Sequence, residues 1–166
     1  MDRKLTAIEV IGTAIRSEEE AAKFYGRIAK MVGNEFVRIK YEALAKEEIG
    51  HRNLLIDLYN RLTDKMDNPP RVPGAPQTAE GGPLPEQTTD NIEQMLKEAI
   101  AREKKASDFY RQAAESALDP SGKRILQYLS SVEHGHELML SAELDAYQRD
   151  SEWYSKQPPD MIFVGP

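Results

Sequence analysis

One arrangement of five side chains occurs twice in this chain of 166 residues. Glutamate, phenylalanine, tyrosine, glutamate and histidine recur in the same order and at the same spacings. Glu18, Phe24, Tyr25, Glu48 and His51 are matched, 85 residues later, by Glu103, Phe109, Tyr110, Glu133 and His136. Similarity of a sequence to itself at a fixed offset indicates a duplicated structural unit. We therefore predict an internal duplication in which each copy supplies half of one pseudo-symmetric site.

The first half has the pattern of two helices. Its apolar residues recur at three- and four-residue steps, which places them on one face of an α-helix. One helix is expected from Leu5 to Gly33, which closes it, and a second from about residue 35 to about residue 63, with Asn34 able to cap it. The short break between them predicts an antiparallel hairpin.

The second half repeats this pattern. A third helix is expected from near Asp90, which can cap it, to Asp119. Asp119 and Pro120 then combine a cap with a proline at the first helical position, which predicts a fourth helix from Pro120 to about residue 149. The chain is therefore predicted to be all-α and built from two helical hairpins.

The segment that joins the two hairpins sets the topology. Residues 64–90 contain six prolines and three glycines, which cannot sustain a helix or a central strand. A linker of this length fits a crossover between two parallel helices, whereas an up-down hairpin needs only a few residues. We expect a four-helix bundle over residues 1–149 with a long crossover at 64–90.

The end of the chain, residues 150–166, has a different character from the helices. It is rich in aromatic residues and proline, too aromatic for a solvated tail and too proline-rich for a helix. We predict an extended tail that packs on the bundle or on a partner chain. The alternative is a tail without fixed structure.

Each predicted helix has acidic residues on its apolar stripe. The first and third stripes are interrupted by Glu18 and Glu103, and the second and fourth by Glu-x-x-His, namely Glu48 with His51 and Glu133 with His136. Three residues span about one turn, so the two members of each pair project side by side. All six side chains are expected to point into the bundle.

These six side chains predict a site for two metal ions. Four carboxylates buried close together would repel one another, and two divalent cations would balance their charge. Oxygen and imidazole ligands without sulfur suit iron or manganese. One glutamate from each of two helices and Glu-x-x-His from each of the other two is the pattern of di-iron and di-manganese bundles. Tyr25 and Tyr110 lie two turns from Glu18 and Glu103. Each could hydrogen-bond a metal ligand without binding a metal itself.

The motifs resemble the rubrerythrin branch of the ferritin-like superfamily. They are Glu18-x-x-Ala21-x-x-Phe24-Tyr25 with Glu48-x-x-His51, and Glu103-x-x-Ala106-x-x-Phe109-Tyr110 with Glu133-x-x-His136. The resemblance covers roughly residues 4–63 and 88–149.

The resemblance implies a ferritin-like fold that holds two iron ions, with manganese or zinc as other possible metals. It implies bridging by Glu48 and Glu133, terminal ligation by Glu18 and Glu103, and one imidazole per metal from His51 and His136. Such centres react with peroxide or dioxygen, and no catalytic residue is implied beyond the metal ligands. The family also suggests a homodimer.

The chain departs from rubrerythrins proper in two respects. They carry a rubredoxin domain whose iron is bound by four cysteines, and this chain contains no cysteine. Ala106 stands where an additional glutamate would fall in the third helix. The electrons for the reaction would therefore come from an external donor.

Three functions remain open from the sequence. The favoured one is a di-iron oxidoreductase that reduces peroxide or dioxygen. The second is a ferroxidase that stores or delivers iron, and the third is a bundle in which the metals only hold the helices together and the tail binds a partner.

Composition excludes other classes of function. A formal charge of -6 and a pI of about 5.2, without a run of Lys or Arg, argue against a nucleic-acid partner. The absence of cysteine excludes disulfides and thiolate metal sites. Glu9 interrupts what would be the apolar part of a signal peptide, and no apolar run reaches membrane-spanning length, so we expect a cytoplasmic protein without membrane contact.

Two polar residues of the predicted fourth helix are not assigned to the site. His134 lies about 100° around the helix from Glu133 and belongs to no repeat, so a solvated or hydrogen-bonded histidine is expected. Glu143 has Leu58 as its repeat partner, and Leu144 beside it can fill the core instead.

Overall fold

A computed structural model describes residues 7–63 and 91–156, with the backbone alone at residues 154 and 155. Every regular element in this part of the chain is a helix. The elements are α1 (Ala7–Met31), α2 (Glu35–Thr63), α3 (Ile92–Ser116), α4 (Pro120–Arg149) and the short α5 (Trp153–Lys156). The predicted all-α class and the four long helices are confirmed.

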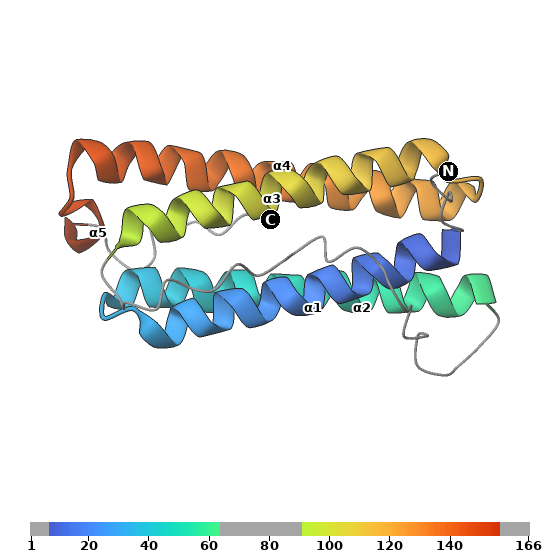
Figure 1. Ribbon diagram of the computed structural model, residues 1–166, viewed down its shortest axis with the longest axis horizontal. Coiled ribbons are helices and arrows are strands. Elements are labelled where there is room, and N and C mark those ends of the chain that lie inside the picture. The colour runs from blue at the N-terminus through green and yellow to red at the C-terminus, as the bar shows by residue number, and fades with distance from the viewer. Residues whose placement is uncertain (1–6, 64–90, 157–166) are drawn as a thin grey trace, which may run out of the picture.

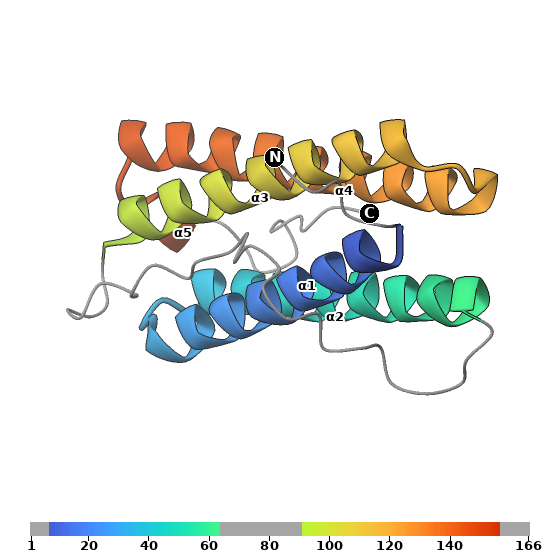
Figure 2. The same ribbon diagram turned by 45° about the vertical axis from the view of Figure 1, so that its right-hand side comes forward.

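The four long helices form a bundle of two layers. α1 packs on α2 in one layer and α3 packs on α4 in the other, as Figures 1 and 2 show from two directions. α2 and α3 run in the same direction along the bundle (Figure 1), which is the arrangement that a long crossover between them predicts. The crossover itself, residues 64–90, lies outside the described residues.

Side-chain caps set the starts of three helices. The N–H of Val37 donates to Oδ1 of Asn34 at 3.1 Å, and Asp119 accepts from the N–H of Gly122, as predicted for α2 and α4. The cap of α3 is Asn91, whose Oδ1 accepts from the third residue of the helix. The prediction of Asp90 was wrong by one residue, because Asp and Asn cap equally well and the sequence pattern does not separate adjacent candidates.

The prediction of an extended tail is corrected where the structure describes it. The segment Trp153–Lys156 forms the helical turn α5, and the N–H of Trp153 donates to the carbonyl oxygen of Asp150. The prolines at 158 and 159, which argued against a helix, lie beyond this turn. Residues 157–166 are outside the described part.

The apolar core lies in two clusters at opposite ends of the bundle. One is formed around Tyr25, Leu44, Leu96 and Leu140, and the other around Ile15, Leu55, Tyr110 and Leu129. Along every long helix, the predicted ligands fall between the two clusters. The site is therefore held from both ends by close-packed side chains, which fix the helices on which it depends. None of the described helices has both the length and the apolar character needed to cross a membrane.

Candidate metal centre

The structure brings all six predicted ligands together at the middle of the bundle. They come from all four long helices, and none is more than 8% exposed. Their ligand atoms form two groups in which all atoms lie within 4.8 Å of one another. The groups are Glu18, Glu48, His51 and Glu133, and Glu48, Glu103, Glu133 and His136. Each group has one histidine, and Glu48 and Glu133 belong to both.

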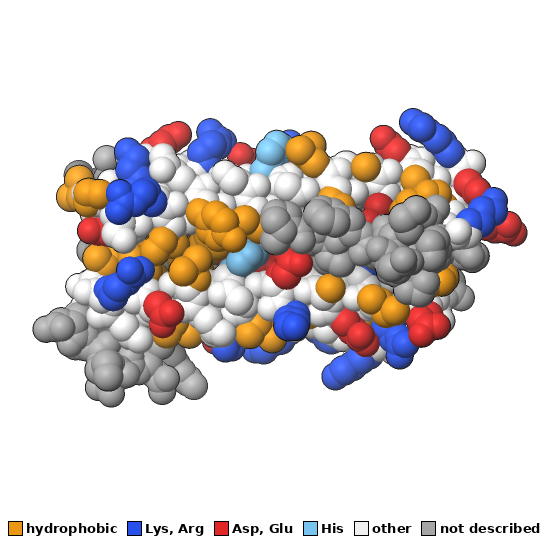
Figure 3. Space-filling view, turned by 180° about the vertical axis from the view of Figure 1, so that it is seen from behind, with side chains coloured by type: hydrophobic (Ala, Val, Ile, Leu, Met, Phe, Trp, Pro, Cys, Tyr) orange, Lys and Arg blue, Asp and Glu red, His pale blue; other side chains and the backbone are white. Residues whose placement is uncertain are grey.

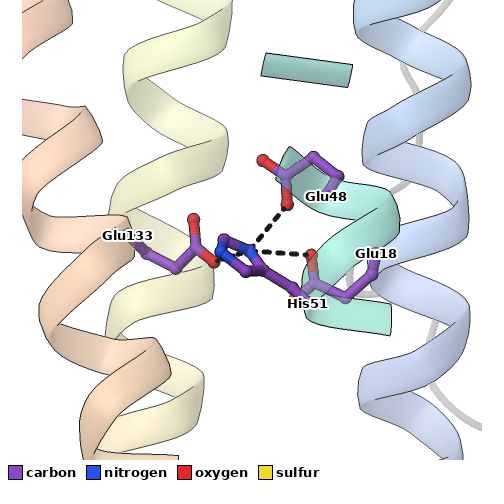
Figure 4. A group of neighbouring side chains, drawn as sticks. All are labelled: Glu18, Glu48, His51 and Glu133. Carbon is purple, nitrogen blue, oxygen red and sulfur yellow. Dashed lines mark hydrogen bonds and ion pairs between the residues drawn. The ribbon is translucent and has the colours of Figure 1, made fainter. Parts of the chain in front are cut away.

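The first group surrounds the Nδ1 atom of His51 (Figure 4). This atom lies 2.9 Å from Oε1 of Glu133 and 3.3 Å from Oε2 of Glu48. Oε2 of Glu18 is at 3.8 Å. Predicted ligands from α1, α2 and α4 thus converge on one small volume.

The second group surrounds Nδ1 of His136 in the same way. This atom lies 3.4 Å from Oε2 of Glu133 and 3.6 Å from Oε2 of Glu103. Glu133 therefore turns one oxygen toward each histidine, Oε1 toward His51 and Oε2 toward His136. A carboxylate in this position can bind two metals at once, one through each oxygen.

The two tyrosines bind across the duplication. The hydroxyl of Tyr25 on α1 donates to Glu103 on α3, and the hydroxyl of Tyr110 on α3 donates to Glu18 on α1. The spacing in the sequence placed each tyrosine on the face of its own glutamate. The structure pairs each with the glutamate of the other half, because α1 and α3 face each other across the centre. Each bond orients one carboxylate and fixes α1 relative to α3.

The donor set fits metal ions, because several buried atoms lack other partners. Among the described residues, neither oxygen of Glu133 nor Nδ1 of His136 makes a hydrogen bond of good geometry. Buried polar atoms are normally paired, and each exception needs an explanation. Cations among the carboxylates and imidazoles would explain why these three atoms have no hydrogen-bond partner in the described part of the protein.

In the metal-free centre, burial and the neighbouring charges shift the pKa of several predicted ligands. Burial raises the pKa of Glu18 well above its ordinary value, and the charge of Glu48 adds to this effect. Burial likewise raises the pKa of Glu103 to about 8. Burial disfavours the charged form of His136, but the carboxylates of Glu103, Glu133 and Glu47 outweigh it and raise the pKa to about 12. Without metal, protons balance the negative charge.

The metal-free protein should therefore lose stability as the pH rises. The pKa of Glu103 is about 8 in the folded state against 4.5 for an ordinary glutamate, so over this range the folded state binds more protons. Its contribution is present below pH 4.5 and is lost as the pH rises through 8. We expect the free energy of unfolding to fall by up to roughly 5 kcal/mol across this window. Urea unfolding of chelator-treated protein measures it.

The isosteric variant Glu103→Gln provides the control for this pH dependence. It has no titrating carboxyl at position 103, so its stability should change less with pH than that of the parent chain. Equal pH slopes in the two proteins would contradict this assignment.

The sequence missed a carboxylate next to the centre. Oε2 of Glu47 lies 2.8 Å from Nε2 of His136, on the opposite side of the ring from the other carboxylates. Glu47 precedes Glu48 and lies off the apolar stripe, and its repeat position is occupied by Val132. Neither periodicity nor duplication therefore signalled it.

Sequence reasoning also did not predict a buried ion pair between α2 and α4. It lies along the seam between these two helices, which the contact of Glu47 with His136 also crosses. Nζ of Lys40 is fully buried and donates to Oε1 of Glu143, which is 8% exposed. Burial lowers the pKa of Lys40, although Glu143 opposes this effect. Leu144 packs on the core as expected and Glu143 belongs to neither ligand group, but Glu143 is buried as well, because Lys40 supplies the partner that lets the carboxylate be buried. His134 is exposed and contacts Glu137, as expected.

A cavity of about 320 Å³ lies between α1 and α3 and reaches the centre. All four predicted glutamate ligands contribute to its lining. Ala21 and Ala106, which occupy equivalent positions in the two halves, also line it. Ala106 is the position at which the resemblance implied an additional glutamate, so a methyl group leaves room there beside the predicted ligands.

Comparison with known proteins identifies the family pattern over most of the chain. The family model described as Rubrerythrin matches residues 9–144. The uncharacterized protein YhjR of Bacillus subtilis (strain 168) is 26% identical over 123 residues, which cover 74% of this chain and 76% of YhjR.

Solved structures share the fold. A dodecameric thioferritin, the bacterioferritin-related protein of Bacteroides fragilis, has a TM-score of 0.72 at 22% identity over 88% of each chain. The bacterioferritin of Rhodobacter capsulatus, described with a metal-free dinuclear site and a haem iron, has a TM-score of 0.69 at 23% identity over 93% of this chain and 94% of its own. A hypothetical protein of Pyrococcus furiosus has a TM-score of 0.69 at 24% identity over 87% of this chain and 92% of its own. At these identities the similarity shows the ferritin-like four-helix fold.

Proposed function

The chain belongs to the rubrerythrin family, and from this membership we propose that it is a di-iron oxidoreductase that reduces peroxide or dioxygen. The observation that carries the proposal is the sharing of Glu48 and Glu133 between two ligand groups that each contain one histidine. This arrangement suits two metals held side by side. Iron is the proposed metal because carboxylate and imidazole ligands without sulfur suit it, and because it can supply electrons.

The six predicted ligands have distinct tasks in this proposal. Glu48 and Glu133 would bind both metals, while Glu18 and Glu103 would each bind one metal and are oriented by Tyr110 and Tyr25, respectively. His51 would bind one metal and His136 the other, each through Nδ1. When bound, two ferrous ions provide the electrons and the Lewis acidity for reduction of an O–O bond.

The surrounding protein controls access to the centre. The cavity between α1 and α3 is much larger than the roughly 30 Å³ that one water molecule occupies. A small oxidant would approach the predicted ligands from this side, past Ala21 and Ala106. The apolar clusters at both ends of the bundle keep bulk water from reaching the centre along the bundle axis. An external donor would return the electrons, and a homodimer is the proposed assembly.

Rapid mixing tests the reaction. Metal-free protein is loaded with Fe(II) without oxygen and mixed with hydrogen peroxide or with air-saturated buffer, and the absorbance of ferric iron is followed. We expect rapid oxidation in the parent chain and a rate at least roughly 100-fold lower in His136→Ala, because one metal loses its imidazole ligand. His134→Ala is the matched control, since His134 lies on the same helix but is exposed. It should react like the parent chain.

The same experiment separates the alternatives. Binding of Fe(II) without oxidation would reject the oxidoreductase and leave a bundle that is only stabilised by metal. Continued uptake of iron far beyond the centre, together with assembly into a shell, would indicate iron storage instead. Multiple turnovers with a reductant and peroxide, without accumulation of iron, would support the proposed reaction.

A further inference from the structure

Only one of the two predicted histidine ligands has a carboxylate at Nε2, the ring nitrogen that does not face the other predicted ligands. Nε2 of His136 lies 2.8 Å from Oε2 of Glu47, and since a carboxylate accepts, the imidazole N–H donates. Nδ1 of the same ring faces Glu103 and Glu133 in the centre. Glu47 therefore stabilises the tautomer in which the lone pair of Nδ1 points at the metal position.

The duplication gives His51 no equivalent partner. The residue 85 positions after Glu47 is Val132, which is 7% exposed and cannot accept a hydrogen bond through its side chain. The ion pairs of His51 all involve Nδ1. Among the described side chains, no carboxylate accepts a hydrogen bond from its Nε2.

Glu47 belongs to the seam between α2 and α4. The side chain is 25% exposed, and His136 comes from the other helix of the seam. Figure 3 shows acidic and histidine atoms together at the middle of this seam. The contact therefore joins the two halves of the duplicated chain, and it can be altered without opening the apolar core.

We propose that Glu47 makes the two metal positions unequal, so that the position of His136 fills first and holds its metal more tightly than the position of His51. Glu47 acts as a positioning residue. Its hydrogen bond fixes the orientation of the imidazole and makes Nδ1 a stronger donor, and the loss of such a partner commonly weakens metal binding by about 10–100-fold. The inference rests on the proposed two-metal centre, but not on the reaction at that centre.

Titration with Co(II) tests this inference, because its visible absorption reports binding to histidine and carboxylate. The parent chain should bind in two steps whose affinities differ by roughly 10–100-fold. Glu47→Leu should weaken the tighter step until the two coincide, and Glu47→Gln, which keeps an acceptor oxygen, should restore part of the difference. Glu42→Leu is the matched control, because Glu42 is an exposed carboxylate on the same helix. It should leave both steps unchanged.

A second measurement assigns the tighter step to His136. His51→Ala should retain the tighter step, and His136→Ala should retain only the weaker one. In the Co(II)-loaded parent chain, the exchangeable N–H proton of His136 should give a shifted NMR resonance that persists in water, because Glu47 protects it. In Glu47→Leu this resonance should broaden through exchange. A role of Glu47 in stability alone would not change this signal.

The outcomes separate this inference from the proposed function. Two equal Co(II) affinities in the parent chain, or unequal affinities that Glu47→Leu leaves unchanged, would overturn the role of Glu47 and leave the two-metal centre standing. Absence of Co(II) binding would overturn both.

Discussion

A chain in which alanine replaces Glu133 is expected to bind neither of the two metals. Oε1 of Glu133 lies 2.9 Å from Nδ1 of His51 and Oε2 lies 3.4 Å from Nδ1 of His136, so this one carboxylate serves both positions. Its loss removes a ligand from each metal and leaves the remaining carboxylates without a bridge. We expect affinity at both positions to fall by more than roughly 100-fold, beyond the effect of losing an outer hydrogen-bond partner.

Equilibrium dialysis with Mn(II) or Co(II), followed by elemental analysis, measures this effect. Glu18→Ala is the informative comparison, since Glu18 belongs to one ligand group only, and this variant should keep one metal. Glu137→Ala is the matched control, because Glu137 is one turn from Glu133 on the same helix and instead contacts the exposed His134. Retention of two metals by Glu133→Ala would contradict a bridging role.

Loading with metal should raise the melting temperature by a large amount. Metal binding to the folded state alone stabilises it by about 4 kcal/mol per site when the free metal is 1,000 times its dissociation constant. Two sites then contribute about 8 kcal/mol, and for a chain of this size each kcal/mol shifts the melting temperature by roughly 2–4 °C. The expected shift is of the order of 15–30 °C. Bound metal would balance the carboxylate charges of the centre, where burial and neighbouring carboxylates raise the pKa of Glu18 and Glu103.

Differential scanning calorimetry of metal-free and metal-loaded protein measures the shift. Glu133→Ala should melt at the same temperature with and without metal. A parent chain whose melting temperature does not respond to Fe(II), Mn(II) or Co(II) would contradict a site built from these six side chains.

The fold was predictable because its determinants act within single helices. The apolar steps, the caps at Asn34 and Asp119 and the proline-rich segment at 64–90 each act over a few neighbouring residues. The six predicted ligands were found for the same reason, since each interrupts an apolar stripe and recurs in the second half. Iron stays a prediction, because carboxylate and imidazole ligands also suit manganese.

Contacts between helices were not predictable in this way. Glu47 reaches His136, and Lys40 reaches Glu143, from α2 to α4. Such contacts depend on the axial alignment of two helices, which the pattern along one helix does not contain. The duplication gave no sign of the ion pair of Glu143, because its repeat partner is the uncharged Leu58.

The tyrosines illustrate the same limit. Their spacing correctly placed Tyr25 and Tyr110 near glutamates of the centre. Which glutamate each would bind depended on how α1 faces α3, and the structure shows the crossed pairing. Pseudo-symmetric halves can exchange such contacts without any change in sequence pattern.

Anaerobic titration of the metal-free chain with Fe(II) tests the central claim most directly. The account predicts saturation at two iron ions per chain, one for each ligand group. Saturation at one iron per chain, or the absence of tight binding, would contradict a di-iron centre.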